Sequence, residues 1–210
     1  MFSVIIPTYN RADLLVRALK SLIAQTYKDW EAIIVDDGST DDTYSQIKFY
    51  LEPDSGIKYK RRRHVGEARS KNFGINTSSG KFITFLDSDD EYATSHLESR
   101  KDFLEQNPHI KFLYGGVKIL GNQYVPDKND PTVKINLNDC VIGGTFVIER
   151  DTLLALKGFT NIILGPDRDL FERARKKNIT IAEVKVPTYI YHHENPDSIT
   201  NKLYLQVNNP

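Results

Sequence analysis

The chain has 210 residues, 40% of them hydrophobic and 27% charged, and its 28 Lys and Arg residues balance its 28 Asp and Glu residues. This length is typical of one globular domain, and the zero net charge excludes a general electrostatic attraction to nucleic acid or to an anionic membrane. The single cysteine, Cys140, excludes an internal disulfide and a cysteine-rich zinc site, and is expected to be a small buried side chain.

In the first half of the chain, short apolar runs alternate with segments of helical periodicity. The apolar runs that predict buried strands lie at residues 2–6, 30–35, 56–60 and 81–86. The spacing of apolar residues predicts helices over residues 13–25, 42–50 and 66–75. This alternation predicts an α/β fold with a mostly parallel central sheet and helices on both faces.

The second half of the chain is less regular. Helices are predicted over residues 94–106, 151–156 and 167–177. Strands are predicted at 112–120, as a strand pair, and at 141–148 and 179–186. Residues 121–138 are polar, contain two prolines and predict a loop, and an aromatic and histidine-rich tail covers 189–200. Since no change in composition marks a domain boundary, residues 1–210 are expected to form one domain.

Polar clusters follow three of the predicted strands, at residues 7–11, 36–39 and 87–90. Because ligands bind at the carboxyl ends of the strands in parallel sheets, these clusters are expected to lie along one functional edge. The last cluster holds three carboxylates in four residues, and alternate residues on an extended segment face the same way. Asp87 and Asp89 therefore suit a hard divalent cation, while a solvated turn that caps the next helix is the alternative.

Four segments, at residues 3–11, 34–41, 68–74 and 85–90, resemble in order and spacing the motifs of the family 2 glycosyltransferases. The resemblance covers the first 90 residues. It implies the GT-A fold, with a Rossmann-like nucleotide-binding half at 1–92 and an acceptor half at 93–210. It also implies an inverting transfer of a sugar from a nucleotide-diphosphate sugar, with UDP-sugars favoured, to the hydroxyl of a glycan or other acceptor.

The resemblance further implies roles for individual residues. Those implied to bind the donor nucleotide or its diphosphate are Pro7, Tyr9, Arg11, Asp36, Arg69, Asp87, Ser88 and Asp89. The residues implied to ligate Mn²⁺ or Mg²⁺ are Asp87, Asp89 and His193. Three of these roles have a structural alternative: turn chemistry for Asp36, a solvated helix surface for Arg69, and a surface or packed histidine for His193.

An inverting transfer needs a general base that removes the proton of the attacking hydroxyl. The segment 165–170 resembles the family motif that carries this base, and the match assigns the role to Asp167, although Pro166 stands where the family usually has glutamate. Complementarity with the helix dipole is the alternative for Asp167 and for Asp169. Gly143 and Gly144 would allow a sugar to approach the backbone, or would form a bulge.

The basic run at residues 58–63 is interpreted as a solvated edge. A sugar nucleotidyltransferase and a dinucleotide-binding enzyme are disfavoured, because no glycine-rich loop follows the first strand. A module that binds a nucleotide sugar without catalysis stays open, since Pro166 departs from the family motif. No apolar stretch reaches the roughly 20 residues of a membrane span, so a cytoplasmic protein is expected, with peripheral membrane association as the alternative.

Overall fold

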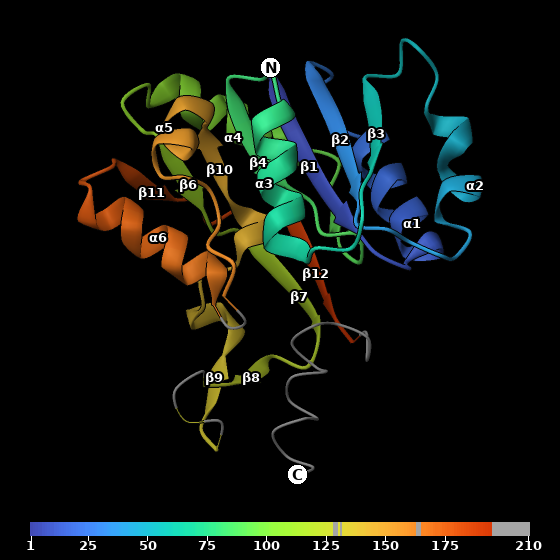
Figure 1. The fold of residues 1–210 in the computed structure, drawn as a ribbon. Coiled ribbons are helices and arrows are strands. Elements are labelled where there is room, and N and C mark those ends of the chain that lie inside the picture. The colour runs from blue at the N-terminus through green and yellow to red at the C-terminus, as the bar shows by residue number, and fades with distance from the viewer. Residues whose placement is uncertain (128–129, 131, 163–164, 195–210) are drawn as a thin grey trace.

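The computed structural model describes residues 1–127, 130, 132–162 and 165–194. Its centre is a seven-stranded sheet in the order β11-β6-β10-β4-β1-β2-β3 (Figure 1). Neighbouring strands are parallel except at β10, which is antiparallel to both β4 and β6. The strands are β1 (Phe2–Thr8), β2 (Trp30–Asp36), β3 (Ile57–Arg61), β4 (Phe82–Phe85), β6 (Phe112–Tyr114), β10 (Val147–Glu149) and β11 (Ile181–Glu183). The expected mostly parallel sheet is confirmed.

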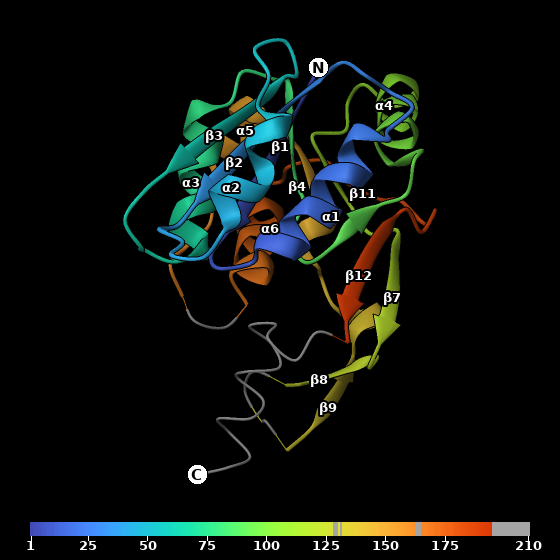
Figure 2. The same ribbon diagram turned by 90° about the vertical axis from the view of Figure 1, so that its right-hand side faces the viewer.

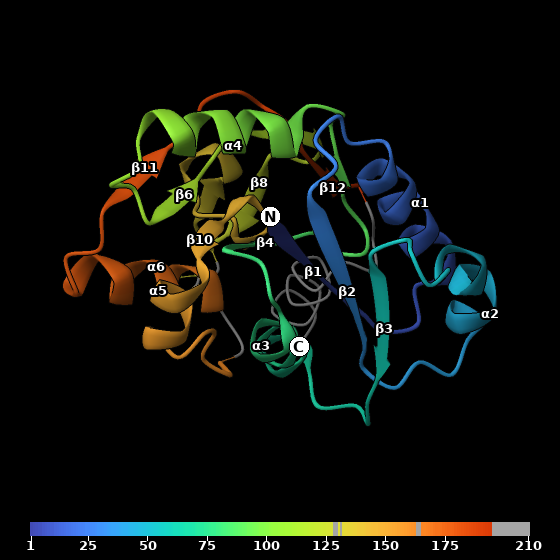
Figure 3. The same cartoon turned by 90° about the horizontal axis from the view of Figure 1, so that it is seen from above.

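Helices cover both faces of this sheet, as predicted (Figure 3). One face carries α1 (Ala12–Ile23), α2 (Thr43–Ile47), a 3₁₀ turn (Lys48–Tyr50) and α4 (His96–Gln106), and the other carries α3 (Glu67–Thr77), α5 (Arg150–Ala155) and α6 (Pro166–Lys176). The central strand β1 shows why its sequence is continuously apolar. Val4 and Ile6 pack into the core under α1, whereas Ile5 belongs to the core under α3. None of the described helices is long and apolar enough to span a membrane.

Two smaller sheets extend from the main sheet (Figures 1 and 2). One has the order β5-β12-β7, with β12 antiparallel to β5 and parallel to β7. The other is a hairpin of β8 and β9. The bounds of these strands are β5 (Glu91–Tyr92), β7 (Val117–Gly121), β8 (Tyr124–Pro126), β9 (Lys134–Asn136) and β12 (Tyr189–His193).

The second half differs from the predictions at four places. Segment 112–120 is not a strand pair: Gly115 and Gly116 both have positive φ, and this break sends β6 and β7 into different sheets. Segment 121–138, predicted as a loop, holds the β8–β9 hairpin and a 3₁₀ turn (Leu137–Asp139). The prediction missed these strands because they are short and polar and lack the apolar alternation that identifies a strand.

The other two differences are shorter strands. Segment 141–148 contains a 3₁₀ turn (Gly143–Thr145), and only its end belongs to β10. Segment 179–186 pairs only over β11, which has a single neighbour at the edge of the sheet. Cys140 is half-buried rather than buried. The tail residues 195–200 lie outside the described residues.

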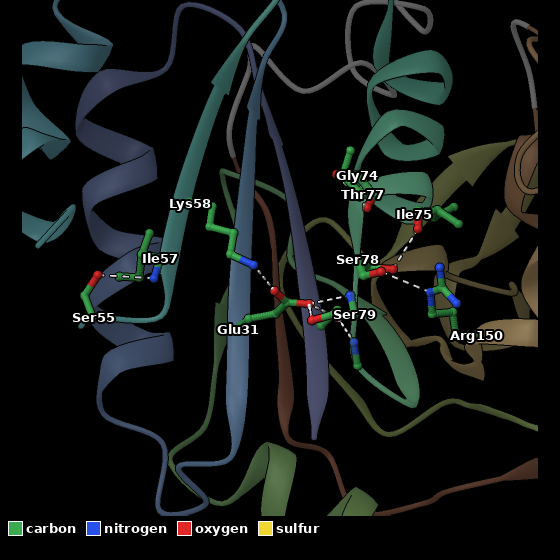
Figure 4. Close-up of polar contacts among 12 residues, drawn as sticks. Glu31, Ser55, Ile57, Lys58, Gly74, Ile75, Thr77, Ser78, Ser79 and Arg150 are labelled. Atoms are coloured by element: carbon green, nitrogen blue, oxygen red, sulfur yellow. Dashed lines mark hydrogen bonds and ion pairs between the residues drawn. The ribbon is translucent and has the colours of Figure 1, made fainter. Parts of the chain in front are cut away.

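A buried carboxylate ties the sheet together at the end opposite the polar clusters (Figure 4). Glu31 on β2 accepts hydrogen bonds from the Ser3 hydroxyl at 2.6 Å and from the Ser79 backbone N–H at 2.6 Å, and pairs with Lys58 at 2.6 Å. Burial alone would raise the pKa of Glu31, but these partners lower it to about 2. Glu31 therefore acts as a structural anion that links β1, β2, β3 and the turn before β4.

Candidate active site

The three predicted polar clusters converge at the carboxyl ends of β1, β2 and β4. These strands are parallel neighbours, with Thr8 of β1 opposite Asp36 of β2. The Asn10 N–H donates to the Ser39 hydroxyl at 2.9 Å, which ties the first cluster to the second. The Arg11 guanidinium pairs with the Asp89 carboxylate at 2.7 Å, which ties the first cluster to the third. The sequence-based expectation of a single polar edge is confirmed.

Asp36 is 1% exposed, and both of its oxygens are engaged by the protein. One accepts the Ser39 N–H at 2.7 Å, and the other accepts the Tyr59 hydroxyl. A pocket of about 150 Å³ opens beside it, lined by Asp36, Ser39, Thr40, Asp41, Tyr44, Tyr59 and Arg61. The lining includes neither Asp87 nor Asp89, so the pocket is an extension of the edge on the β2–β3 side.

The first cluster presents an aromatic face. Tyr9 is 42% exposed, and its ring stacks on His64 with centroids 4.2 Å apart. Asp37, which the sequence analysis did not single out, accepts hydrogen bonds from the Val65 and Gly66 backbone N–H groups at 2.9 and 2.8 Å. Asp37 thereby fixes the start of α3 against this edge. Pro7, which was predicted to bind the nucleotide, is buried within β1.

The third cluster contains carboxylates in different environments. Asp89 is 8% exposed, and burial raises its pKa although Arg11 opposes the rise. Asp90 points into the protein, where it accepts the Tyr189 hydroxyl at 2.6 Å and the His192 N–H at 2.8 Å. Burial, with Asp89 and Asp87 nearby, raises the pKa of Asp90 well above its usual range. Ser88, between Asp87 and Asp89, is 2% exposed, so its side chain is buried.

Lys71 on α3 is a buried cation of the site that was not predicted from the sequence. It is 3% exposed and pairs with Glu67 at 2.6 Å and with Asp87 at 3.0 Å. Burial alone would lower its pKa, but Asp87, Glu67 and Asp167 together raise it well above the usual lysine value. Arg69, the residue predicted for this helix, is exposed. The helix therefore turns Lys71, and not Arg69, toward Asp87.

Asp167 lies in the first turn of α6, after Gly165 in the left-handed conformation and Pro166 at the helix start. Asp167 is partly buried, and its carboxylate accepts the Gly143 N–H at 2.9 Å. Burial raises the pKa of Asp167 to about 6, against the opposing effect of Lys71. Its neighbour Asp169 is bound instead by Thr160 and Arg173, at 2.7 and 2.8 Å.

The carboxylates Asp87 and Asp89 fit a hard cation, because Mg²⁺ and Mn²⁺ take oxygen ligands and complete their shell with phosphate and water. The expected three-ligand group with His193 is not formed. Within residues 1–127, 130, 132–162 and 165–194, no three His, Cys, Asp or Glu side chains gather to hold a metal. His193 lies on β12, where the pairing with β7 directs its Nδ1 to the Asn122 carbonyl at 2.5 Å.

Comparison with known proteins gives a consistent family and fold. The sequence model described as glycosyl transferase family 2 matches residues 3–159. Over 186 residues, 83% of the chain, the sequence is 43% identical to the GalNAc(5)-diNAcBac-PP-undecaprenol beta-1,3-glucosyltransferase of Campylobacter jejuni. S. aureus TarS 1–349 in complex with UDP-GlcNAc superposes with a TM-score of 0.77 over 94% of the chain, at 21% identity.

A second solved structure has the same fold. The mannosyltransferase PcManGT from Pyrobaculum calidifontis, in complex with GDP-Man and Mn²⁺, superposes with a TM-score of 0.70 over 90% of the chain, at 19% identity. The chain spans less than two thirds of these proteins: 60% of the Campylobacter protein, 60% of TarS 1–349 and 56% of PcManGT. The GT-A fold expected from the sequence is confirmed.

Proposed function

Because the chain belongs to glycosyl transferase family 2, we propose that it transfers a sugar from a nucleotide-diphosphate sugar to an acceptor hydroxyl, with inversion at the anomeric carbon. The observation that carries the proposal is the partly buried carboxyl group of Asp167, which accepts the Gly143 N–H and whose pKa, raised to about 6, suits a general base near neutral pH. Lys71 pairs with Asp87 and also interacts electrostatically with Asp167, so the same cation lies near the proposed base and near the donor end of the site.

In the proposed reaction, the Asp167 carboxylate takes the proton of the acceptor hydroxyl. The hydroxyl oxygen then forms a bond to the anomeric carbon, while the bond from that carbon to the diphosphate oxygen breaks. The electron pair of the broken bond leaves with the nucleoside diphosphate. Lys71 keeps Asp167 ionised above about pH 6, since its positive charge favours the carboxylate.

The leaving diphosphate gains negative charge, which needs compensation. Asp87 and Asp89 would hold Mn²⁺ or Mg²⁺, which supplies Lewis-acid stabilisation of the leaving group when bound. Mn²⁺ in the mannosyltransferase of the same fold supports this assignment. Arg11 occupies the Asp89 carboxylate at 2.7 Å, so binding of a cation would release the guanidinium toward the phosphates.

The donor is proposed to be a UDP-sugar, since TarS of the same fold binds UDP-GlcNAc. The nucleotide would lie along the edge formed by Pro7, Tyr9 and Asp36. The acceptor is proposed to be a glycan on a lipid diphosphate, because the Campylobacter relative is named for such an acceptor. A lipid-linked acceptor would require the protein to work at a membrane surface.

The test measures nucleotide release. UDP-glucose, UDP-GlcNAc, GDP-mannose and a dTDP-sugar are each incubated with the chain and Mn²⁺, with and without an undecaprenyl diphosphate-linked glycan. Acceptor-dependent release of one nucleoside diphosphate is expected, and Asp167→Asn should abolish it while nucleotide binding persists. Binding of a nucleotide sugar without release by the wild type would instead identify a non-catalytic module.

A further inference from the structure

The 3₁₀ turn Gly143–Thr145 contains two consecutive glycines that the backbone conformation does not require. Neither Gly143 nor Gly144 has a positive φ, so an alanine could adopt either conformation. What excludes a larger residue is the space beside each Cα. We propose that this turn is a positioning element for the transfer: Gly143 seats the Asp167 carboxylate, and Gly144 seats the Tyr189 hydroxyl. The inference rests on the proposed glycosyl transfer.

Gly143 lies directly under the proposed base. A Cβ at this position would come within 2.7 Å of all three atoms of the Asp167 carboxyl group. The Gly143 N–H also donates to Asp167 Oδ2 at 2.9 Å. The carboxylate thus rests against the Cα of Gly143 and is oriented by its amide, in a place that no other residue type would leave open. A side chain of the protein itself therefore fills the space beside the Gly143 Cα.

Gly144 has the same relation to Tyr189. Three atoms at the hydroxyl end of the Tyr189 side chain would lie within 2.8 Å of a Cβ on Gly144. Tyr189 is 0% exposed and packs edge-on against Tyr92 with ring centroids 5.8 Å apart, so its ring cannot swing aside into solvent. Its hydroxyl donates to Asp90 Oδ2 at 2.6 Å and accepts from the Asp87 N–H at 3.4 Å. A shift of Tyr189 would therefore move the loop that carries Asp87.

The turn itself is anchored. The Thr145 hydroxyl donates to the Ile142 carbonyl at 2.7 Å and accepts the Gly115 N–H at 3.0 Å, which fixes the turn to the junction between β6 and β7. Thr145 is 1% exposed. One rigid turn thus contacts the proposed base on α6 and, through Tyr189, the carboxylate loop after β4. The separation between the acceptor hydroxyl and the donor diphosphate is set by this contact.

This arrangement predicts a division of effects between the two glycines. Gly143→Ala displaces the base and leaves the donor loop in place, so it should lower kcat by roughly 100-fold with an unchanged Kd for UDP. Gly144→Ala displaces Tyr189, so it should raise the Kd for UDP in the presence of Mn²⁺ by about tenfold. Tyr189→Phe removes the hydroxyl without adding bulk and should raise the same Kd.

Two comparisons separate positioning from a general loss of stability. Gly74→Ala on α3 is the matched control, because the three atoms nearest to its Cβ would all belong to the Ile5 side chain, the first at 2.5 Å. It should lower the urea midpoint while kcat and the Kd for UDP stay at wild-type values. Gly143→Ala should also lower the urea midpoint of the wild type. In the Asp167→Ala background, the same Gly143→Ala substitution should leave the midpoint unchanged, because truncation of Asp167 empties the space that the new methyl group enters.

These measurements also distinguish this inference from the proposed function. Midpoints and the Kd for UDP need no turnover, so an absence of transfer by the wild type would refute the proposed function alone. A midpoint loss for Gly143→Ala that persists beside Asp167→Ala would overturn the seating of the base. Equal changes of kcat and Kd in both glycine variants, in proportion to their midpoints, would overturn the division of roles.

Discussion

Replacing Asp167 with asparagine should stabilise the protein above pH 6 while it abolishes transfer. The pKa of Asp167 is raised from 3.8 to about 6, mainly by burial. Between these values the folded state binds more protons than the unfolded state, so the free energy of unfolding falls as pH rises. A shift of about two pKa units corresponds to about 3 kcal/mol, as an upper bound, because the residue is only partly buried.

Urea denaturation at several values between pH 4 and pH 8 provides the measurement. The difference in unfolding free energy between Asp167→Asn and the wild type should grow through pH 4 to 6 and then level off, since asparagine does not titrate. Asp169→Asn is the control on the same helix turn. Burial would raise the pKa of Asp169, but Thr160 and Arg173 lower it, so its replacement should destabilise the protein near neutral pH.

A difference between Asp167→Asn and the wild type that stays constant from pH 4 to pH 8 would refute this reasoning. It would mean that the carboxyl group titrates at its ordinary pKa, as a solvated helix-capping group does. The general base would then lose its physical support, whatever the activity of the variant. A value of kcat/KM that rises with pH to a plateau above about 6 would agree with the stability measurement.

Three further substitutions have definite expected outcomes. Lys71→Met removes the buried cation that pairs with the partly exposed carboxylates of Glu67 and Asp87, so it should lower the unfolding free energy by about 1–3 kcal/mol in urea denaturation, and an unchanged value would contradict a stabilising role of the ion pairs. Asp89→Ala should remove the part of the UDP-induced rise in Tm that depends on Mn²⁺, and an undiminished metal effect would exclude Asp89 as a ligand. Glu31→Gln should lower the unfolding free energy at pH 7 by about 1–3 kcal/mol. This difference from the wild type should disappear as the pH falls from 4.5 toward 2, where the wild-type carboxylate becomes protonated. A destabilisation that persists at low pH would mean that the substitution acts through side-chain packing and not through the charge of Glu31.

The first half of the fold could be predicted from the sequence because its signals are strong and local. Continuous apolar runs such as that of β1 occur in strands buried on both faces, and parallel strands place the residues that follow them at one edge. That rule was sufficient to bring Arg11 and Asp89 together, although 78 positions separate them in the chain. The second half lacked such signals, since β8 and β9 have three residues each and pair only with each other.

Within the site, the sequence identified the kind of chemistry better than the individual cation. Lys71 went unassigned because lysine is rarely buried, and its burial depends on three carboxylates that come from different segments. Arg69 is two residues away on the same helix, and α-helical geometry turns it away from Lys71 and toward solvent. Helical spacing measured from the buried Ala68 and Ile75 would have placed Lys71, and not Arg69, on the inner face.

The contrast between Glu31 and Asp167 shows why one buried carboxylate is structural and the other suits catalysis. Glu31 is surrounded by donors that stabilise its charge, so its pKa falls to about 2 and it remains ionised across the physiological range. Among the residues that the structure describes, one backbone donor binds the Asp167 carboxyl group and two other acidic groups lie nearby, so its charge is only marginally favoured near pH 6. A carboxylate as well satisfied as Glu31 would be too weak a base to accept a proton from a hydroxyl. The incomplete satisfaction of Asp167, held in place by Gly143, is thus what would give it the strength of a base.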